Sequence, residues 1–204
     1  MQLIPTHEEV VALLRRTGGL RDGHFEYPNG LHANEFMQVP LTMRSYEAAK
    51  ILNVGLSRML RAHADLRAVI PELSVVAPAT GGLPVAYGVC EALRARQVYW
   101  AERDNGGGAL RFRQFLDIQP GEKILLVDDI LRTGQRLSEL KHLVEGQGGE
   151  VMALAVVVYQ PYPDAVRFDP LPFYYLAKLD AVYAKDADSC AWCKKGVPLE
   201  KVRA

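Results

Sequence analysis

Residues 123–136 have the sequence KILLVDDILRTGQR, and this stretch determines how the rest of the chain is interpreted. The apolar run at 124–127 predicts a buried strand, and residues 137–145 predict a helix after it. Two acids, Asp128 and Asp129, stand where the strand ends. In an open parallel sheet, ligands bind beyond the carboxyl ends of the strands. We therefore expect both acids to face a ligand.

The turn after the acids has the chemistry of a phosphate site. It offers backbone N–H groups, the Thr133 hydroxyl and a helix N-terminus, all of which favour an anion. Gly134 permits a close approach of the backbone. The two carboxylates can accept hydrogen bonds from a vicinal diol or hold Mg²⁺ through water. Together these groups predict a site for ribose 5-phosphate; the alternative is that Asp128 and Asp129 merely cap the next helix.

The surrounding segments alternate between strands and helices. Apolar spacing predicts further buried strands at 73–77, 97–101 and 151–159, and one long helix at 44–67. This alternation indicates an α/β fold with an open, mostly parallel sheet flanked by helices. Residues 1–204 are expected to form a single domain. Within it, the segments 18–40 and 160–204 are expected to form a small hood.

Composition and charge exclude some broad classes of protein. Of the 204 residues, 49% are hydrophobic, which is enough for one sizeable core. Lys plus Arg and Asp plus Glu number 24 each, whereas a nonspecific nucleic-acid or membrane-surface binder is more often basic. The sequence shows no apolar run of bilayer length and no signal-peptide pattern, and three cysteines do not make a disulfide framework. We expect a cytoplasmic protein.

Two further loops are candidates for the same site. The sequence APATGG at 77–82 follows a predicted strand and opens a helix, so its amides can face a diphosphate, although a plain strand-to-helix turn also accounts for it. The candidate diphosphate-binding residues are Ala79, Thr80, Gly81 and Gly82. The sequence ERDNGGG at 102–108 is either a mobile lid or a flexible hairpin tip. Arg103 is the candidate lid cation, with Arg111 and Arg113 as substitutes.

The stretch at 123–136 closely resembles the motif by which type I phosphoribosyltransferases bind 5-phosphoribosyl 1-diphosphate (PRPP). The resemblance implies that Asp128 and Asp129 bind the ribose hydroxyls and act with Mg²⁺. It implies a 5-phosphate site made of Leu131, Arg132, Thr133, Gly134, Gln135 and Arg136. Gln135 and Arg136 stand where the family has small residues, and Arg136 could add a charged donor to the phosphate. The family resemblance also favours a homodimer.

Three other segments resemble orotate phosphoribosyltransferases: GHFEYPNGLHANEFMQ at 23–38, AERDNGG at 101–107 and SCAWCKKGVPLEK at 189–201. Some positions depart from that pattern. Pro28 replaces a lysine that touches orotate in many members, and Gln160 replaces the arginine that meets the orotate carboxylate. The lid also lacks the lysine and histidine of many members.

The expected base-side residues are Phe25, Tyr27, Phe36 and Gln160. The three aromatic side chains could stack on a planar base or belong to the core. The expected activity is transfer of ribose 5-phosphate from PRPP to a nitrogenous base, with orotate as the first candidate and Asp128, Asp129 and Arg103 as catalytic residues. The alternatives are a phosphoribosyltransferase for another base and a regulator that binds PRPP or a nucleotide without catalysis.

Cys190 and Cys193 form a CxxC pair whose role the sequence leaves open. Zinc usually needs four ligands, so a dimer could bring two such pairs together. A redox pair and a plain structural turn are the other interpretations. His24 and His32 lie in the predicted base-side loop and could touch a ligand. The remaining histidines, His7, His63 and His142, are expected in helices without a catalytic role.

Overall fold

The computed structural model describes residues 4–104 and 107–202. Its larger sheet has six strands in the order β5-β4-β3-β6-β7-β8. The pairs among β4, β3, β6, β7 and β8 are parallel, and β5 pairs with β4 in antiparallel fashion. The strands are β3 (Ser74–Pro78), β4 (Gln97–Asp104), β5 (Gly107–Phe112), β6 (Lys123–Leu131), β7 (Glu150–Tyr159) and β8 (Phe173–Lys178). The predicted α/β fold is confirmed.

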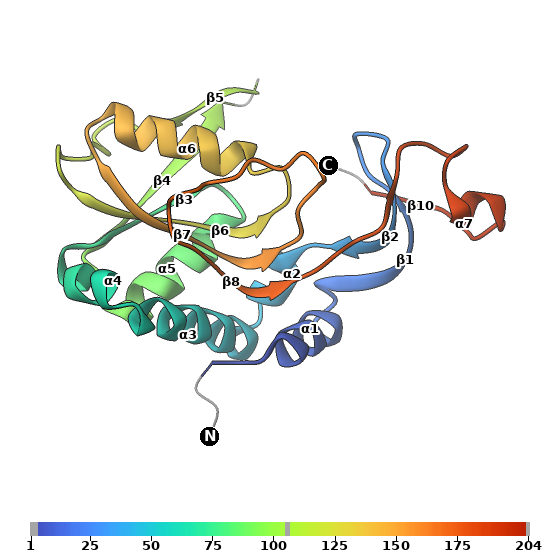
Figure 1. Ribbon diagram of the computed structural model, residues 1–204, viewed down its shortest axis with the longest axis horizontal. Helices are drawn as coiled ribbons and strands as arrows, with labels where there is room; N and C mark the ends of the chain where they lie inside the picture. The colour runs from blue at the N-terminus through green and yellow to red at the C-terminus, as the bar shows by residue number, and fades with distance from the viewer. Residues whose placement is uncertain (1–3, 105–106, 203–204) are drawn as a thin grey trace.

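Helices cover both faces of this sheet (Figure 1). The helices α1 (His7–Arg16), α3 (Tyr46–Ala62) and α5 (Gly82–Leu93) cover one face, and α6 (Gln135–Gly146) covers the other. In β6, Leu125 and Val127 pack into the first layer, whereas Ile124 and Leu126 pack into the second. Continuous apolar strands are therefore needed, because successive side chains enter opposite layers.

The predicted helix at 44–67 is two helices. It divides at His63, whose backbone is extended (φ −88°, ψ 125°) and whose ring packs edge-on against Tyr174 at 4.7 Å. The second piece is α4 (Ala64–Val69), followed by the 3₁₀ turn η1 (Ile70–Glu72). A short helix, α2 (Val39–Met43), begins at the end of the predicted hood segment 18–40 and continues beyond it.

A second sheet joins the two ends of the chain. Its order is β10-β1-β2-β9, and it lies beside the larger sheet, with the short helix α7 (Ala191–Lys194) outside it (Figure 1). The strands are β1 (Leu20–Glu26), β2 (His32–Met37), β9 (Tyr183–Ala184) and β10 (Glu200–Lys201). The predicted hood range 160–204 was too wide, because β8 is an edge strand of the larger sheet. We use "hood" below for the second sheet and α7.

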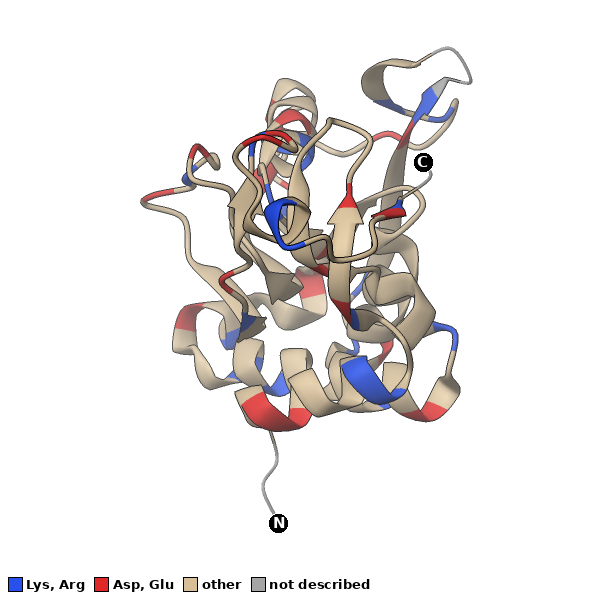
Figure 2. Cartoon of the chain, turned by 90° about the vertical axis from the view of Figure 1, so that its right-hand side faces the viewer, with Lys and Arg blue, Asp and Glu red and all other residues tan. Residues whose placement is uncertain are grey.

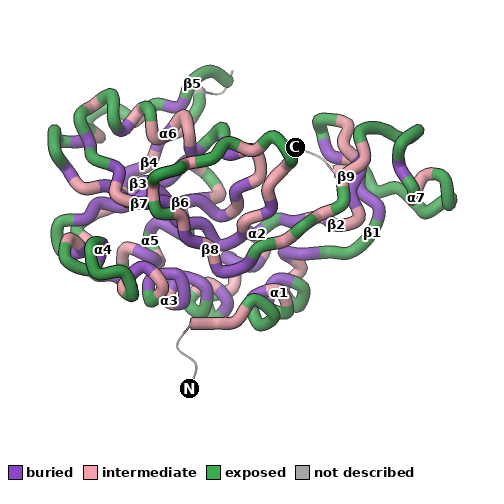
Figure 3. The backbone as a smooth tube through the Cα atoms, viewed as in Figure 1, coloured by how far each residue is buried: buried purple, intermediate pink, exposed green. Residues whose placement is uncertain are grey.

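Burial and charge differ between the two parts. The central strands β3, β6 and β7 of the larger sheet are largely buried, whereas the outer C-terminal segment is mostly exposed (Figure 3). Acidic and basic residues are interspersed over the face drawn in Figure 2, as expected for a chain without net charge. Within residues 4–104 and 107–202, no helix combines the length and apolarity needed to cross a bilayer.

Candidate active site

The acidic pair lies in the buried end of β6. Asp128 is 3% exposed and Asp129 is 7% exposed. The Asp129 N–H donates to Asp128 Oδ1 at 2.9 Å, and the Ile130 N–H donates to Asp129 Oδ1 at 2.9 Å. Burial, followed by the neighbouring charge of Asp129, raises the pKa of Asp128 well above its ordinary value. Two adjacent buried carboxylates are costly without partners, so this arrangement suits a bound cation or hydroxyl donors.

The turn after the acids encloses a cavity of about 180 Å³ at the N-terminus of α6. The lining includes both acids and then Leu131, Arg132, Thr133, Gly134 and Arg136. Gly134 has φ +74°, a left-handed conformation that glycine adopts without strain. A concave site at a helix N-terminus, beside an arginine, favours a phosphate.

The side chain of Arg132 points away from this turn and toward the hood. Its Nη2 donates to the Met37 carbonyl at 2.9 Å and to the Tyr27 hydroxyl at 3.4 Å. Its guanidinium carbon lies 5.1 Å from the centre of the Tyr27 ring, a distance at which cation–π attraction operates. The backbone of Arg132 remains in the turn, where its carbonyl accepts from the Tyr162 N–H at 3.1 Å. The backbone of Arg132 therefore lies in the predicted phosphate turn, whereas its guanidinium contacts the hood.

Gln160 links Arg132 to a buried acid of the hood. It is 1% exposed, accepts from Arg132 Nε at 3.1 Å and donates its amide to the Glu35 carboxylate. Burial raises the pKa of Glu35, partly offset by the hydrogen bond from Gln160. The Tyr183 hydroxyl is buried and has no hydrogen-bond partner in the described part of the chain. An unpaired buried hydroxyl near an arginine suits recognition of a polar ligand.

The predicted base-side aromatics lie together in the hairpin β1–β2. Phe25 is 2% exposed, and its ring centre lies 5.6 Å from that of Phe36. The ring centres of Tyr27 and Phe36 lie 6.2 Å apart. Phe25 thus has the core role that the sequence left open, whereas Tyr27 contacts Arg132 directly. The importance of Tyr27 in orienting a charged side chain could not be seen in the sequence.

The predicted diphosphate loop lies against the acidic pair. A Cβ on Gly81 would lie 3.0 Å from the Asp129 carboxylate, and one on Gly82 would lie 3.1 Å from Asp128 Oδ1. The structure therefore brings the two loops together and requires glycine-sized residues where they meet. The Ala79 N–H donates to the Ala101 carbonyl at 2.8 Å, so this amide is already bonded to the neighbouring strand. The Thr80 carbonyl accepts from the Leu83 N–H at 3.3 Å, where α5 begins.

The predicted lid is the hairpin of β4 and β5, and its Asn105 and Gly106 lie outside the described residues. Arg103 forms an ion pair with Glu139 of α6 and donates to the Gly108 carbonyl. The substitute candidates lie on the same hairpin: Arg113 pairs with Glu102, which is the register partner of Arg111.

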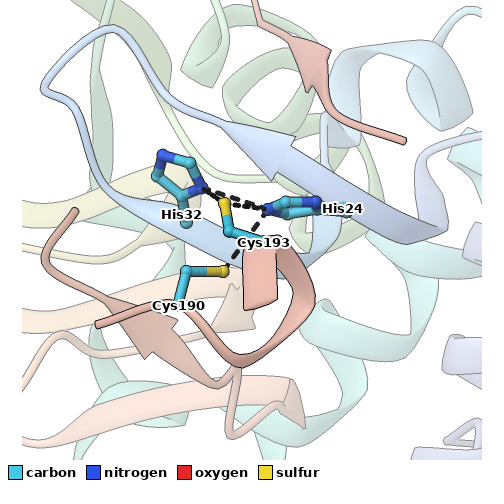
Figure 4. Close-up of side chains that lie close together, drawn as sticks. All are labelled: His24, His32, Cys190 and Cys193. Carbon is cyan, nitrogen blue, oxygen red and sulfur yellow. Dashed lines mark hydrogen bonds between the residues drawn. The ribbon is translucent and has the colours of Figure 1, made fainter. Parts of the chain in front are cut away.

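The CxxC pair lies in the hood, apart from the acidic pair. The structure places Cys190 and Cys193 beside His24 and His32 of the same chain (Figure 4). For a metal site, the sequence suggested a second cysteine pair from a dimer; a redox pair and a plain structural turn were the other interpretations. For His24 and His32, the sequence indicated only that they could touch a ligand.

Comparison with known proteins identifies relatives over most of the chain. The family described as phosphoribosyl transferase domain matches residues 55–166. An orotate phosphoribosyltransferase of Carboxydothermus hydrogenoformans is 35% identical over 182 residues, covering 89% of this chain and 90% of the relative. One from Thermotoga maritima is 32% identical over 190 residues, covering 93% of this chain and 94% of the relative.

Solved structures share the fold at lower sequence identity. The orotate phosphoribosyltransferase of Mycobacterium tuberculosis, in complex with inorganic phosphate, has a TM-score of 0.63 and 22% identity, covering 85% of this chain and 95% of that one. An adenine phosphoribosyltransferase of Thermoanaerobacter pseudethanolicus has a TM-score of 0.58 and 16% identity, covering 71% and 88%. Enzymes for different bases share this fold, so the fold alone does not identify the base.

Proposed function

Because the chain belongs to the phosphoribosyltransferase family, we propose that it transfers the ribose 5-phosphate group of PRPP to orotate and releases diphosphate. The observation that carries the choice of orotate is the Arg132 guanidinium beside Gln160. Arg132 supplies a cation beside position 160, where Gln160 replaces the arginine of the orotate pattern. The relatives that are 32–35% identical to this chain are named orotate phosphoribosyltransferases, which supports the same base.

The PRPP half of the proposed site is formed by the acidic pair at the end of β6 and by two loops. Asp128 and Asp129 accept hydrogen bonds from the ribose hydroxyls, and the turn from Leu131 to Arg136 holds the 5-phosphate. The loop at 79–82 holds the diphosphate, since its glycines lie against the acids. These loops come from the carboxyl ends of neighbouring strands, where ligands bind in an open parallel sheet.

The base half must bind a planar anion. A buried carboxylate without a cationic partner costs several kcal/mol, by the general magnitude for broken buried ion pairs. Gln160 cannot supply that charge, but Arg132 can. A cavity of about 630 Å³ with Thr133, Tyr162 and Tyr183 in its lining lies between the turn and the hood. Thr133 also lines the cavity beside the acidic pair, whose lining includes Arg132, so we place orotate where the two cavities adjoin, with its carboxylate toward Arg132.

The proposed reaction is displacement of diphosphate from C1 of PRPP by a ring nitrogen of the base. The chain holds the sugar through Asp128 and Asp129, whose negative charge stabilises positive charge that develops on the ribose. Closing the β4–β5 hairpin excludes water and brings Arg103 toward the leaving diphosphate. The buried acidic pair fits Mg²⁺ held through water, and such an ion neutralises charge on the diphosphate when bound.

Two finer points belong to the same proposal. We place the protein in the cytoplasm, because Cys190 and Cys193 form no disulfide, and reduced cysteines suit a reducing compartment. We also propose a homodimer formed through α3 and α5, which pack together and expose Tyr46 (73%) and Tyr87 (55%). Sedimentation of the wild type and of Tyr87→Glu tests the dimer, since a buried charge at the interface would favour the monomer.

The activity is tested by incubating the protein with PRPP, Mg²⁺ and, separately, orotate, uracil, adenine or hypoxanthine, and measuring nucleotide and diphosphate. We expect nucleotide from orotate at a rate at least about tenfold above any other base. Faster transfer to another base would overturn orotate while leaving phosphoribosyl transfer intact. Tight PRPP binding with no diphosphate released for any base would instead identify a regulator.

A further inference from the structure

Four side chains with metal-binding atoms converge in the hood. They come from four places: His24 from β1, His32 from β2, Cys190 from the residue before α7 and Cys193 from α7 itself. Their ligand atoms all lie within 4.8 Å of one another, and the side chains point toward a common centre (Figure 4). Cys190, His24 and His32 are 0%, 3% and 4% exposed, whereas Cys193 is partly exposed, so the cluster lies at the edge of the buried interior.

Four of the six separations between the ligand atoms are close to those of a tetrahedral metal site. His24 Nε2 lies 3.0 Å from His32 Nδ1, 3.4 Å from Cys190 Sγ and 3.5 Å from Cys193 Sγ, and the last sulfur lies 3.4 Å from His32 Nδ1. Around zinc, with Zn–N of about 2.0 Å and Zn–S of about 2.3 Å, tetrahedral geometry separates neighbouring ligands by about 3.3–3.8 Å. These four separations differ from the tetrahedral values by a few tenths of an ångström.

Hydrogen bonding alone does not satisfy this arrangement. A ring nitrogen carries either one proton or one lone pair, so His24 Nε2 cannot form three good hydrogen bonds to its three neighbours. The other nitrogen, His24 Nδ1, lies 3.0 Å from the Val197 carbonyl and can donate to it. That donation leaves a lone pair on Nε2, directed into the cluster. A backbone carbonyl that orients a histidine in this way is a common partner of metal ligands.

The chain around the cysteines has the geometry of a metal-binding turn. Gly196 has φ +66°, and its N–H donates to the Cys193 carbonyl at 3.0 Å. The Val197 N–H then donates to the Trp192 carbonyl at 3.0 Å, which places the Val197 carbonyl near His24. A glycine is needed here because other residues rarely adopt this φ.

The C-terminal segment has little apolar burial to hold it. Among residues 185–201, all of which the structure describes, Cys190 alone is buried. The strands that attach this segment, β9 and β10, are two residues each. Small units with too little core to fold are commonly stabilised by a structural metal.

We propose that His24, His32, Cys190 and Cys193 bind one zinc ion within a single chain, and that this ion fastens the C-terminal segment to the β1–β2 hairpin. Two nitrogens and two sulfurs in tetrahedral arrangement are the ligands that zinc prefers. Two thiolates balance the charge of Zn²⁺. All four positions are filled by protein, as in structural rather than catalytic zinc sites. The proposed zinc site does not depend on which base is bound, because none of its ligands lines either of the two cavities described above.

Metal analysis of the purified full-length chain tests the binding. We expect one equivalent of zinc in the wild type, none in His24→Gln or Cys193→Ser, and one in Cys90→Ser. Cys90 is a matched control, because it lies on α5 outside the cluster.

Cobalt in place of zinc should give the visible absorption of tetrahedral sulfur and nitrogen ligation. Wild type that binds no zinc after reduction and zinc addition would overturn the site, and so would undiminished binding by Cys193→Ser.

A second measurement uses only the wild type, in case the variants do not fold. Lys194 and Lys195 are exposed beside the cluster and are trypsin sites. Removing zinc with a chelator should speed cleavage there by at least about tenfold, because the segment loses its attachment. Readdition of zinc should restore protection. Equal cleavage rates with and without bound zinc would show that the ion does not fasten this segment.

Discussion

Arg132 Nε donates a hydrogen bond to Gln160 Oε1 at 3.1 Å. Arg132 belongs to the turn after the acidic pair, whereas Gln160 follows the strand β7. The same arginine reaches the hood through the Met37 carbonyl. One residue therefore connects the proposed PRPP turn with the proposed base site, and its side chain can be tested separately from its backbone.

We predict that Arg132→Met weakens the use of orotate. The substitution keeps an unbranched apolar stem and removes the guanidinium with its charge. A hydrogen bond to a charged group contributes about 1.5–3 kcal/mol, so kcat/KM for orotate should fall about ten- to a hundredfold, while the KM for PRPP changes less than about threefold. Steady-state kinetics with each substrate varied in turn measures both values.

The matched variant is Arg136→Met, which removes a charge from the lining of the phosphate cavity. It should raise the KM for PRPP more than that for orotate. An Arg132→Met enzyme whose losses fall equally on the two substrates would show that its guanidinium does not select the base.

A second prediction concerns the contact between Gly81 and Asp129. A Cβ at Gly81 would lie 3.0 Å from all three carboxylate atoms of Asp129, so Gly81→Ala should displace that carboxylate. We expect PRPP affinity, measured by calorimetry with Mg²⁺, to fall by about tenfold or more, since misplaced groups bind poorly. Gly146→Ala is the control, because a Cβ there would meet no atom within 4 Å. If both variants bind PRPP like the wild type, the loop and the acids do not form one site.

The acidic motif and the main sheet were predictable because their signals are local. Residues 124–127 are uniformly apolar, and the acids follow directly, so strand and site adjoin in the sequence. Strand β8 was missed, since FYYLAK at 173–178 carries polar groups on an edge strand and follows a proline-rich segment. Its place is decided by parallel pairing with β7, which sequence periodicity does not specify.

The direction of the Arg132 side chain and the histidine–cysteine cluster were not predictable. Both depend on where the β1–β2 hairpin packs. His24 and Cys190 are brought together by the pairing of two-residue strands with β1 and β2, and such short strands leave almost no sequence signal. The CxxC spacing drew attention to Cys190 and Cys193, two members of the cluster, but the two histidines lie more than 150 residues earlier in the chain.

A third prediction concerns the predicted lid cation. Arg103 is held by Glu139 in an ion pair with exposed side chains (42% and 30%), and such pairs contribute about 0–1 kcal/mol, so lid closure can break it. Arg103→Met should lower kcat at least about tenfold with little change in PRPP affinity, because its charge acts on the departing diphosphate. Single-turnover rates and PRPP titration separate the two effects.

Arg113→Met is the control for this variant, because Arg113 lies on the same hairpin and pairs with Glu102. It should leave the single-turnover rate within about twofold of the wild type. Loss of PRPP affinity without loss of rate in Arg103→Met would reject the proposed lid role.

A fourth prediction concerns the pH dependence of stability at Glu35. The pKa of Glu35 is raised above its ordinary 4.5, mainly by desolvation on burial and to a smaller extent by the charge of Asp22. The Gln160 hydrogen bond and the charges of Arg15 and Arg132 offset part of this rise. The folded state therefore holds this proton more tightly than the unfolded state does. The resulting stabilisation is fully present below pH 4.5 and is lost as the pH rises through the folded pKa.

Glu35→Gln should remove this loss, because the amide keeps a similar shape and an oxygen that accepts from Gln160. In urea unfolding from pH 4 to pH 8, we expect the variant to gain stability relative to the wild type as the pH rises. Glu8→Gln is a control of opposite sign, since hydrogen bonds at the start of α1 lower the pKa of Glu8. That variant should lose stability relative to the wild type at neutral pH and approach it in acid. A constant difference between Glu35→Gln and the wild type at every pH would mean that the Glu35 carboxyl has the same proton affinity folded and unfolded.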